Sequence, residues 1–117
     1  MRIAQAAEKS GLSVDTIRYY EKSGIVPGVA RGADGKRHFS PENIDWLTLL
    51  YWLRQTGMPL KTMRDFAQLY RGGNSTVAAR KTILLEHAAL LQKRRSDLDR
   101  CAEQLQHKIQ IYEELLK

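Results

Sequence analysis

A chain of 117 residues, 43% of them hydrophobic, has room for one small domain with an appendage and excludes a multi-domain enzyme. Its net charge of +6 and pI near 9.7 favour a polyanionic partner, either nucleic acid or an anionic membrane surface. The single cysteine excludes an internal disulfide, and no apolar run is as long as a membrane span or a signal peptide, so we expect a cytoplasmic protein.

The first part of the chain predicts two short helices. Apolar and small side chains recur at helical spacing in residues 3–10, and Gly11 is suited to the tight turn that follows. Ser13 stands where a helix N-cap is expected, so a second helix is predicted over residues 14–23, with Gly24 as its exit. Two helices joined by a short glycine turn are typical of a helix-turn-helix.

The next stretch predicts a hairpin and two further helices. Asp34-Gly35 separates two short extended runs, residues 28–31 and 36–39, which is a hairpin signal. Ser40-Pro41 reads as an N-cap followed by proline at the first helical position, so a third helix should begin there and stop at Gly57. A fourth helix is expected from about Leu60 until the glycines at 72 and 73 interrupt the pattern.

The last forty residues predict one long helix with an apolar seam. Residues 76–117 contain neither Gly nor Pro, and apolar residues recur there in alternating steps of four and three. Such a helix is about 60 Å long and needs a partner helix. A fold-back within the chain is the alternative, but no turn signal interrupts the run, so we expect a homodimer. The predicted dimer seam contains Leu84, Leu91, Leu98, Leu105, Ile109 and Tyr112.

Candidate nucleic-acid contacts lie on the second helix and on the hairpin. On the second helix, Thr16, Arg18 and Tyr19 are predicted to face solvent. Arginine can donate two parallel hydrogen bonds to a guanine edge or a phosphate, and a tyrosine hydroxyl can donate to a phosphate; packing of Tyr19 under the hairpin is the alternative. On the hairpin, the cations Arg31, Lys36 and Arg37, with His38, form either a solvated edge or a wing. Their place directly after a helix-turn-helix favours a wing.

These motifs resemble the MerR family of bacterial transcription regulators. The similarity is carried by IAQAAEKSGLSVDTIRYYEKSGIVP at residues 3–27 and GKRHFSPENIDWLTLLYWLRQTGMPLKTMRDF at residues 35–66. The resemblance implies a mainly α fold, in which a winged helix-turn-helix domain (residues 1–72) precedes a linker and an antiparallel coiled-coil dimerisation helix (residues 73–117).

The same resemblance implies a function. Arg18 and Tyr19 match family positions that contact the operator, Arg37 matches the wing arginine, and Lys61 falls in the second wing, where a backbone contact is expected. The implied partners are double-stranded promoter DNA, a second copy of the chain and RNA polymerase. Members bind pseudo-palindromic promoters and distort the spacer between the promoter elements, which activates or represses transcription in response to an effector.

The sequence contains few residues that could bind or sense an effector, and few that would support a different function. We expect no cofactor and no metal, because the chain lacks the cysteines of metal-sensing relatives. Cys101 is a candidate redox or electrophile sensor, with an idle thiol as the alternative. An architectural, excisionase-like DNA-bending protein is the alternative function, although it would lack the dimer seam. The three histidines are scattered, so we expect no enzyme.

Overall fold

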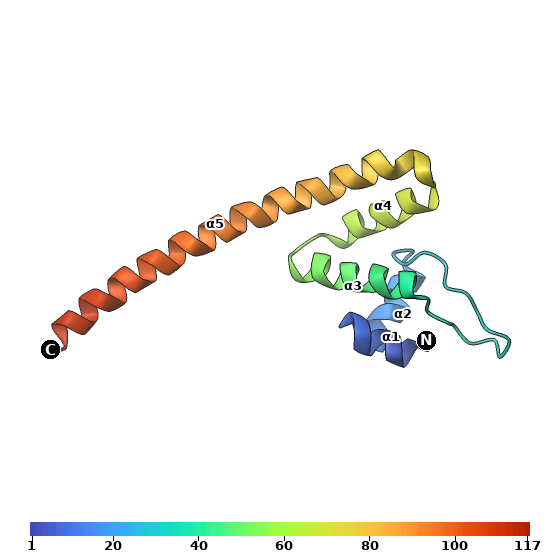
Figure 1. The fold of residues 1–117 in the computed structure, drawn as a ribbon, viewed down its shortest axis with the longest axis horizontal. Helices are drawn as coiled ribbons and strands as arrows, with labels where there is room; N and C mark the ends of the chain where they lie inside the picture. Colours follow the sequence, from blue (N-terminus) through green and yellow to red (C-terminus); the bar gives the residue numbers. More distant parts are fainter. The chain divides into compact units, whose positions relative to one another are not determined.

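The computed structural model describes all residues 1–117, and the chain is mainly helical (Figure 1). This confirms the predicted fold class. The segment between α2 and α3 contains no regular strand, only one isolated antiparallel bridge between Arg31 and Arg37. In chain order the elements are α1 (Ile3–Ser10), α2 (Val14–Lys22), α3 (Pro41–Gln55), α4 (Leu60–Arg71), the 3-10 turn η1 (Asn74–Thr76) and α5 (Val77–Leu115).

The chain divides into two compact units, Met1–Ile83 and Leu84–Lys117. The first unit contains α1 to α4 and also the first turns of α5, because Ile83 packs against its core. The second unit is the remainder of α5, which is one continuous helix (Figure 1). A functional division at residue 72, between a reading domain and a dimerisation segment, stays a prediction.

The starts of α2 and α3 follow from their caps. The Ser13 hydroxyl accepts a hydrogen bond from the Thr16 backbone N–H at 3.0 Å. Ser40 and Asn43 form a reciprocal capping box at the start of α3, with Pro41 in the first helical position. Both helices therefore begin where the sequence predicts, and α2 ends one residue earlier than predicted, at Lys22.

The turn between α1 and α2 is closely packed against α3. Gly11 has a φ of +88°, a conformation that side-chain-bearing residues rarely adopt. A Cβ atom at this position would lie 3.1 Å from the ring of Tyr51. A glycine is therefore required both by the backbone conformation and by the close approach to α3, and this contact fixes the two short helices against the longer one.

The core of the first unit lies between these helices and the base of the hairpin. Its fully buried side chains include Ile17 of α2, Leu47 and Leu50 of α3, and Met63 of α4. Tyr20 is also buried, and burial raises the pKa of its phenol. Ile17 and Tyr20 form the buried face of α2, and the two residues between them, Arg18 and Tyr19, are exposed. None of the helices combines the length and apolar composition needed to cross a membrane.

Candidate nucleic-acid interface

The outward face of α2 carries the predicted recognition residues. The Arg18 side chain is 63% exposed, and its guanidinium lies 3.9 Å from the Asp15 carboxylate. Tyr19 is 49% exposed, whereas the ring of its neighbour Tyr20 is buried 6.0 Å away. About half of the Tyr19 side chain is therefore accessible to a ligand. The Thr16 hydroxyl accepts a hydrogen bond from Ser13 at 2.8 Å, so it lies at the cap of the helix.

The wing, residues 28–39, is a short hairpin whose turn is centred one residue earlier than the Asp34-Gly35 pair suggests. A backbone bond from Gly35 to Gly32 (3.0 Å) closes a turn with Ala33 and Asp34 at its centre, and Gly35 follows with a φ of +77°. This is the three-residue type of hairpin loop, in which a left-handed glycine follows the turn. Beyond it the hairpin has only two cross-strand backbone bonds and no regular ladder.

Asp34 organises this turn. Its carboxylate accepts a hydrogen bond from the Lys36 backbone N–H at 3.0 Å and forms an ion pair with Arg2, which precedes α1. The Lys36 amide, with smaller contributions from the neighbouring Arg2 and His38, lowers the pKa of the Asp34 carboxyl below its usual range. The wing tip is thus tied both to itself and to the start of the chain.

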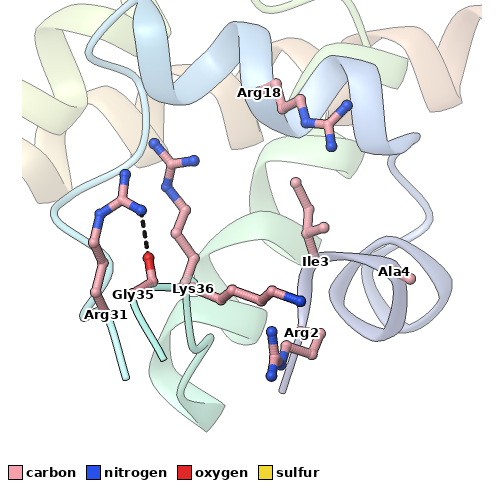
Figure 2. Close-up of a pocket in the computed structure, with 8 residues that line it drawn as sticks. Arg2, Ile3, Ala4, Arg18, Arg31, Gly35 and Lys36 are labelled. Atoms are coloured by element: carbon pink, nitrogen blue, oxygen red, sulfur yellow. Dashed lines mark hydrogen bonds between the residues drawn. The ribbon is translucent and has the colours of Figure 1, made fainter. Parts of the chain in front are cut away.

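Five cationic side chains from three segments surround one open hollow of about 570 Å³. We call this feature the cationic hollow; its cations are Arg2, Arg18, Arg31, Lys36 and Arg37. Figure 2 shows Arg18 extending from α2 toward the hollow, and the Lys36 side chain running from the wing toward Arg2 and Ile3. The Arg31 guanidinium donates to the Gly35 carbonyl at 2.7 Å (Figure 2). This concentration of positive charge favours a polyanion such as a phosphate backbone.

An ion pair fixes the wing to α2. The Arg37 Nε lies 2.7 Å from Oε2 of Glu21, whose side chain is only 13% exposed. The other carboxylate oxygen of Glu21 is buried and has no hydrogen-bond partner in the chain. Because a largely buried carboxylate is costly without a cation beside it, the pair resists separation. Glu21 therefore sets where Arg37 lies relative to Arg18, and both arginines line a second open hollow beside Tyr19.

The structure groups some of the predicted residues and separates others. Arg18, Lys36 and Arg37 share the cationic hollow. His38 lies apart from it: its imidazole is 3.8 Å from Asp34, and it lines a different depression with Trp46. Lys61, at the start of α4, is highly exposed and pairs with Asp65 at 3.2 Å. That any of these residues contacts DNA stays a prediction.

Arg2 and Glu21 also belong to this surface, although the sequence did not indicate them. Arg31, a predicted wing cation, donates across the turn to the Gly35 carbonyl. Arg2 reaches the wing because the Met1 ammonium donates to the Phe39 carbonyl at 3.0 Å, a contact between residues far apart in the chain. Glu21 directly follows Tyr19 and Tyr20, and its pairing with Arg37 is evident only from the structure.

The predicted seam residues of the second unit are largely exposed in the single chain. Leu98 and Leu105 are 70% and 59% exposed, and Leu91, Ile109 and Tyr112 are also exposed. The Cys101 thiol is free and exposed on the same helix. Such a row of apolar side chains is typical of a helix that pairs with another helix.

A helix-turn-helix followed by a basic wing, with a long helix after it, defines the winged helix-turn-helix class of regulator. The family described as "MerR HTH family regulatory protein" matches residues 1–69, and the family described as "MerR, DNA binding" matches residues 44–108. The chain belongs to the MerR family of helix-turn-helix regulatory proteins.

Individual relatives support this assignment. An uncharacterised HTH-type transcriptional regulator of Haemophilus influenzae is 34% identical over 110 residues, 94% of this chain and 82% of that protein. The regulator AdhR of Bacillus subtilis is 37% identical over 86 residues, 74% of this chain and 61% of AdhR. The crystal structure of HiNmlR, a MerR family regulator lacking the sensor domain and bound to promoter DNA, aligns with a TM-score of 0.85 at 34% identity, covering 97% of this chain and 90% of that one.

Proposed function

We propose that the chain is a transcription regulator that binds pseudo-palindromic promoter DNA as a homodimer and distorts the spacer between promoter elements. The observation that carries this proposal is the cationic hollow, in which Arg18 of α2 and Arg37 of the wing lie together while Glu21 holds the wing in place. A helix that reads the groove beside a wing that contacts the phosphate backbone is one arrangement by which proteins bind DNA sequence-specifically. The similarity to a promoter-bound regulator supports it.

Each side chain has a separate role in the proposed complex. Arg18 reads a guanine edge or clamps a phosphate from within the major groove, with Thr16 beside it at the start of the helix. Tyr19 donates its hydroxyl to a phosphate. Lys36 and Arg37 grip the backbone along the wing, and Lys61 adds a further backbone contact from α4.

The exposed seam of α5 supports the dimer in this proposal. Two copies joined through this seam would present two reading units to the two half-sites of a pseudo-palindrome. Distorting the spacer costs a few kcal/mol, which phosphate contacts at both half-sites can supply. The distortion would change how RNA polymerase engages the promoter, and an effector acting on α5 would regulate it. Cys101 is exposed on this helix, so transcription assays with reduced, oxidised, metal-treated and aldehyde-treated protein test for such a signal.

The test begins by selecting duplexes from a random pool with the wild-type protein and mapping its footprint on the enriched sequence. Arg18→Ala should abolish the footprint while sedimentation still reports a dimer, because the substituted side chain is exposed and belongs to the first compact unit, whereas the seam belongs to the second. Arg100→Ala removes the same charge from the exposed surface of α5 and is the matched control; its footprint should persist. Failure of the pool to enrich, or an unchanged affinity in Arg18→Ala, would contradict the proposal.

A further inference from the structure

Three consecutive backbone carbonyls, directly after the recognition helix, accept hydrogen bonds from side chains of α3 and α4. We call residues 24–26 the exit segment, since the chain leaves α2 there on its way to the wing. The Arg71 guanidinium donates to the Gly24 carbonyl at 2.8 Å and to the Val26 carbonyl at 2.9 Å. The Trp46 indole N–H donates to the carbonyl between them, that of Ile25, at 3.0 Å.

These bonds are difficult to replace. Ile25 and Val26 are buried, so their carbonyls have little access to water, and a buried acceptor without a partner is costly. Arg71 contributes a charge-assisted pair of bonds from a planar group that suits two acceptors at once. The exit segment therefore has its position dictated by α3 and α4 rather than by contacts within the wing.

The donor on α3 is itself held in place by aromatic packing. The Trp46 ring stacks on Phe66 of α4, with ring centroids 5.1 Å apart, and also contacts the Tyr70 ring at 4.9 Å. Rings packed on two sides leave the indole little freedom to rotate away from the Ile25 carbonyl. Tyr70 precedes Arg71, so both supports of the exit segment meet at the end of α4.

The same place also contacts the first turns of α5, within the Met1–Ile83 unit. The Arg80 guanidinium lies over the Tyr70 ring, 5.1 Å from its centroid. Arg80 also donates to the Thr76 hydroxyl at 3.1 Å and to the Gly73 carbonyl at 3.2 Å, which ties it to the connection between α4 and α5. A continuous series of contacts thus runs from the beginning of α5, through the end of α4, to the exit of α2.

We propose that Arg71 and Trp46 are positioning residues for DNA reading, which hold the exit segment so that α2 and the wing keep a fixed mutual angle. Arg80, through Tyr70, makes that angle sensitive to the position of the first turns of α5. The inference rests on the proposed function, since it assigns how the reading surface is aligned. Neither residue contacts DNA in this role: both hydrogen-bonding edges of Arg71 used here are directed at backbone carbonyls.

The experiment compares affinities for the selected duplex and for a scrambled duplex of the same length, measured by fluorescence anisotropy on the full chain. Arg71→Ala should weaken binding to the selected duplex about tenfold, because base contacts depend on alignment, and change binding to the scrambled duplex by less than about twofold. Arg71→Lys, which keeps the charge but replaces the two donor nitrogens of the planar guanidinium by one ammonium nitrogen, should restore part of the discrimination. Arg64→Ala, an exposed charge on the same helix, is the control and should lower both affinities alike.

A second variant tests the inference independently of Arg71. Trp46→Phe keeps an aromatic ring for stacking but removes the donor to Ile25, so it should lower the selected-to-scrambled ratio in the same direction. A merely structural role would reduce the active fraction and lower both affinities equally. That equal loss in Arg71→Ala and Trp46→Phe would overturn this inference alone, whereas absence of any sequence preference in the wild-type protein would overturn the proposed function as well.

Discussion

Leucine side chains are buried in one compact unit of the chain and exposed in the other. In Met1–Ile83, Leu47 and Leu50 are fully buried in a core made by helices of the same chain. In Leu84–Lys117, Leu98 and Leu105 are mostly exposed to solvent. The first unit therefore completes its own hydrophobic core, while the second has an apolar row that is exposed in the single chain.

Polar contacts differ between the units in the same way. The first unit is tied by bonds between residues far apart in the sequence, such as Arg71 to Gly24 and Arg37 to Glu21. In the second unit the ion pairs are local, as in Lys93 with Asp97 one turn away. Exposed pairs of this kind contribute little stability and set no tertiary geometry. The geometry of the proposed DNA-binding surface is thus fixed within one chain, whereas in the proposed dimer the distance between two such surfaces depends on how α5 pairs.

The largest effect is expected from charging the seam. Leu98→Glu combined with Leu105→Glu should convert the dimer to a monomer of 13.4 kDa in sedimentation experiments, because like charges would face one another across an apolar contact. Circular dichroism should still report a helical Met1–Ile83 unit.

The matched control is Ser96→Glu combined with Gln104→Glu, which adds the same charge to exposed positions outside the heptad seam. The control should stay dimeric. If the seam variant also remained a dimer, the predicted pairing surface on α5 would be wrong.

A smaller effect is expected from truncating single leucines: in the first unit it should lower folding stability, and in the second it should weaken association. Leu47→Ala should lower the free energy of unfolding of the first unit by about 2 to 5 kcal/mol, since it leaves a cavity in a closed core. Leu98→Ala should leave that transition unchanged and weaken only the association of two chains. Denaturant melts at several protein concentrations separate these effects, because only the dimer-dependent transition shifts with concentration. A shift of the first unit's transition in Leu98→Ala would contradict the division.

Local sequence signals predicted the elements of this fold well, because their causes are local. Ser13 and Ser40 cap the helices that they were expected to start, and the glycine-free run after residue 76 does form one helix. The wing turn was located at Asp34, but the weakness of its ladder was not predicted. Its paired length depends on contacts such as that of Phe39 with Met1, which no local pattern reveals.

The candidate site was predictable only in part, for the same reason. Arg18 and Tyr19 could be placed on the outer face of α2 from helical periodicity, given that Ile17 and Tyr20 face the core. The ion pair between Glu21 and Arg37 joins α2 to the wing. The spacing of these two residues in the sequence does not predict that they lie close together. Arg71 looked like an unremarkable cation at the end of a helix, although its guanidinium supports the exit of α2.

The smallest predicted effect compares two adjacent tyrosines, one exposed and one belonging to the closed core. Tyr19→Phe should weaken binding to the selected and the scrambled duplex about equally, by on the order of 1 kcal/mol, because a hydrogen bond to phosphate carries no base information. Tyr20→Phe, at the buried neighbour, is the matched control and should leave both affinities unchanged. A loss confined to the selected duplex in Tyr19→Phe would show that this hydroxyl contacts a base edge. Tyr19 would then contribute to sequence specificity and not only to binding of the phosphate backbone.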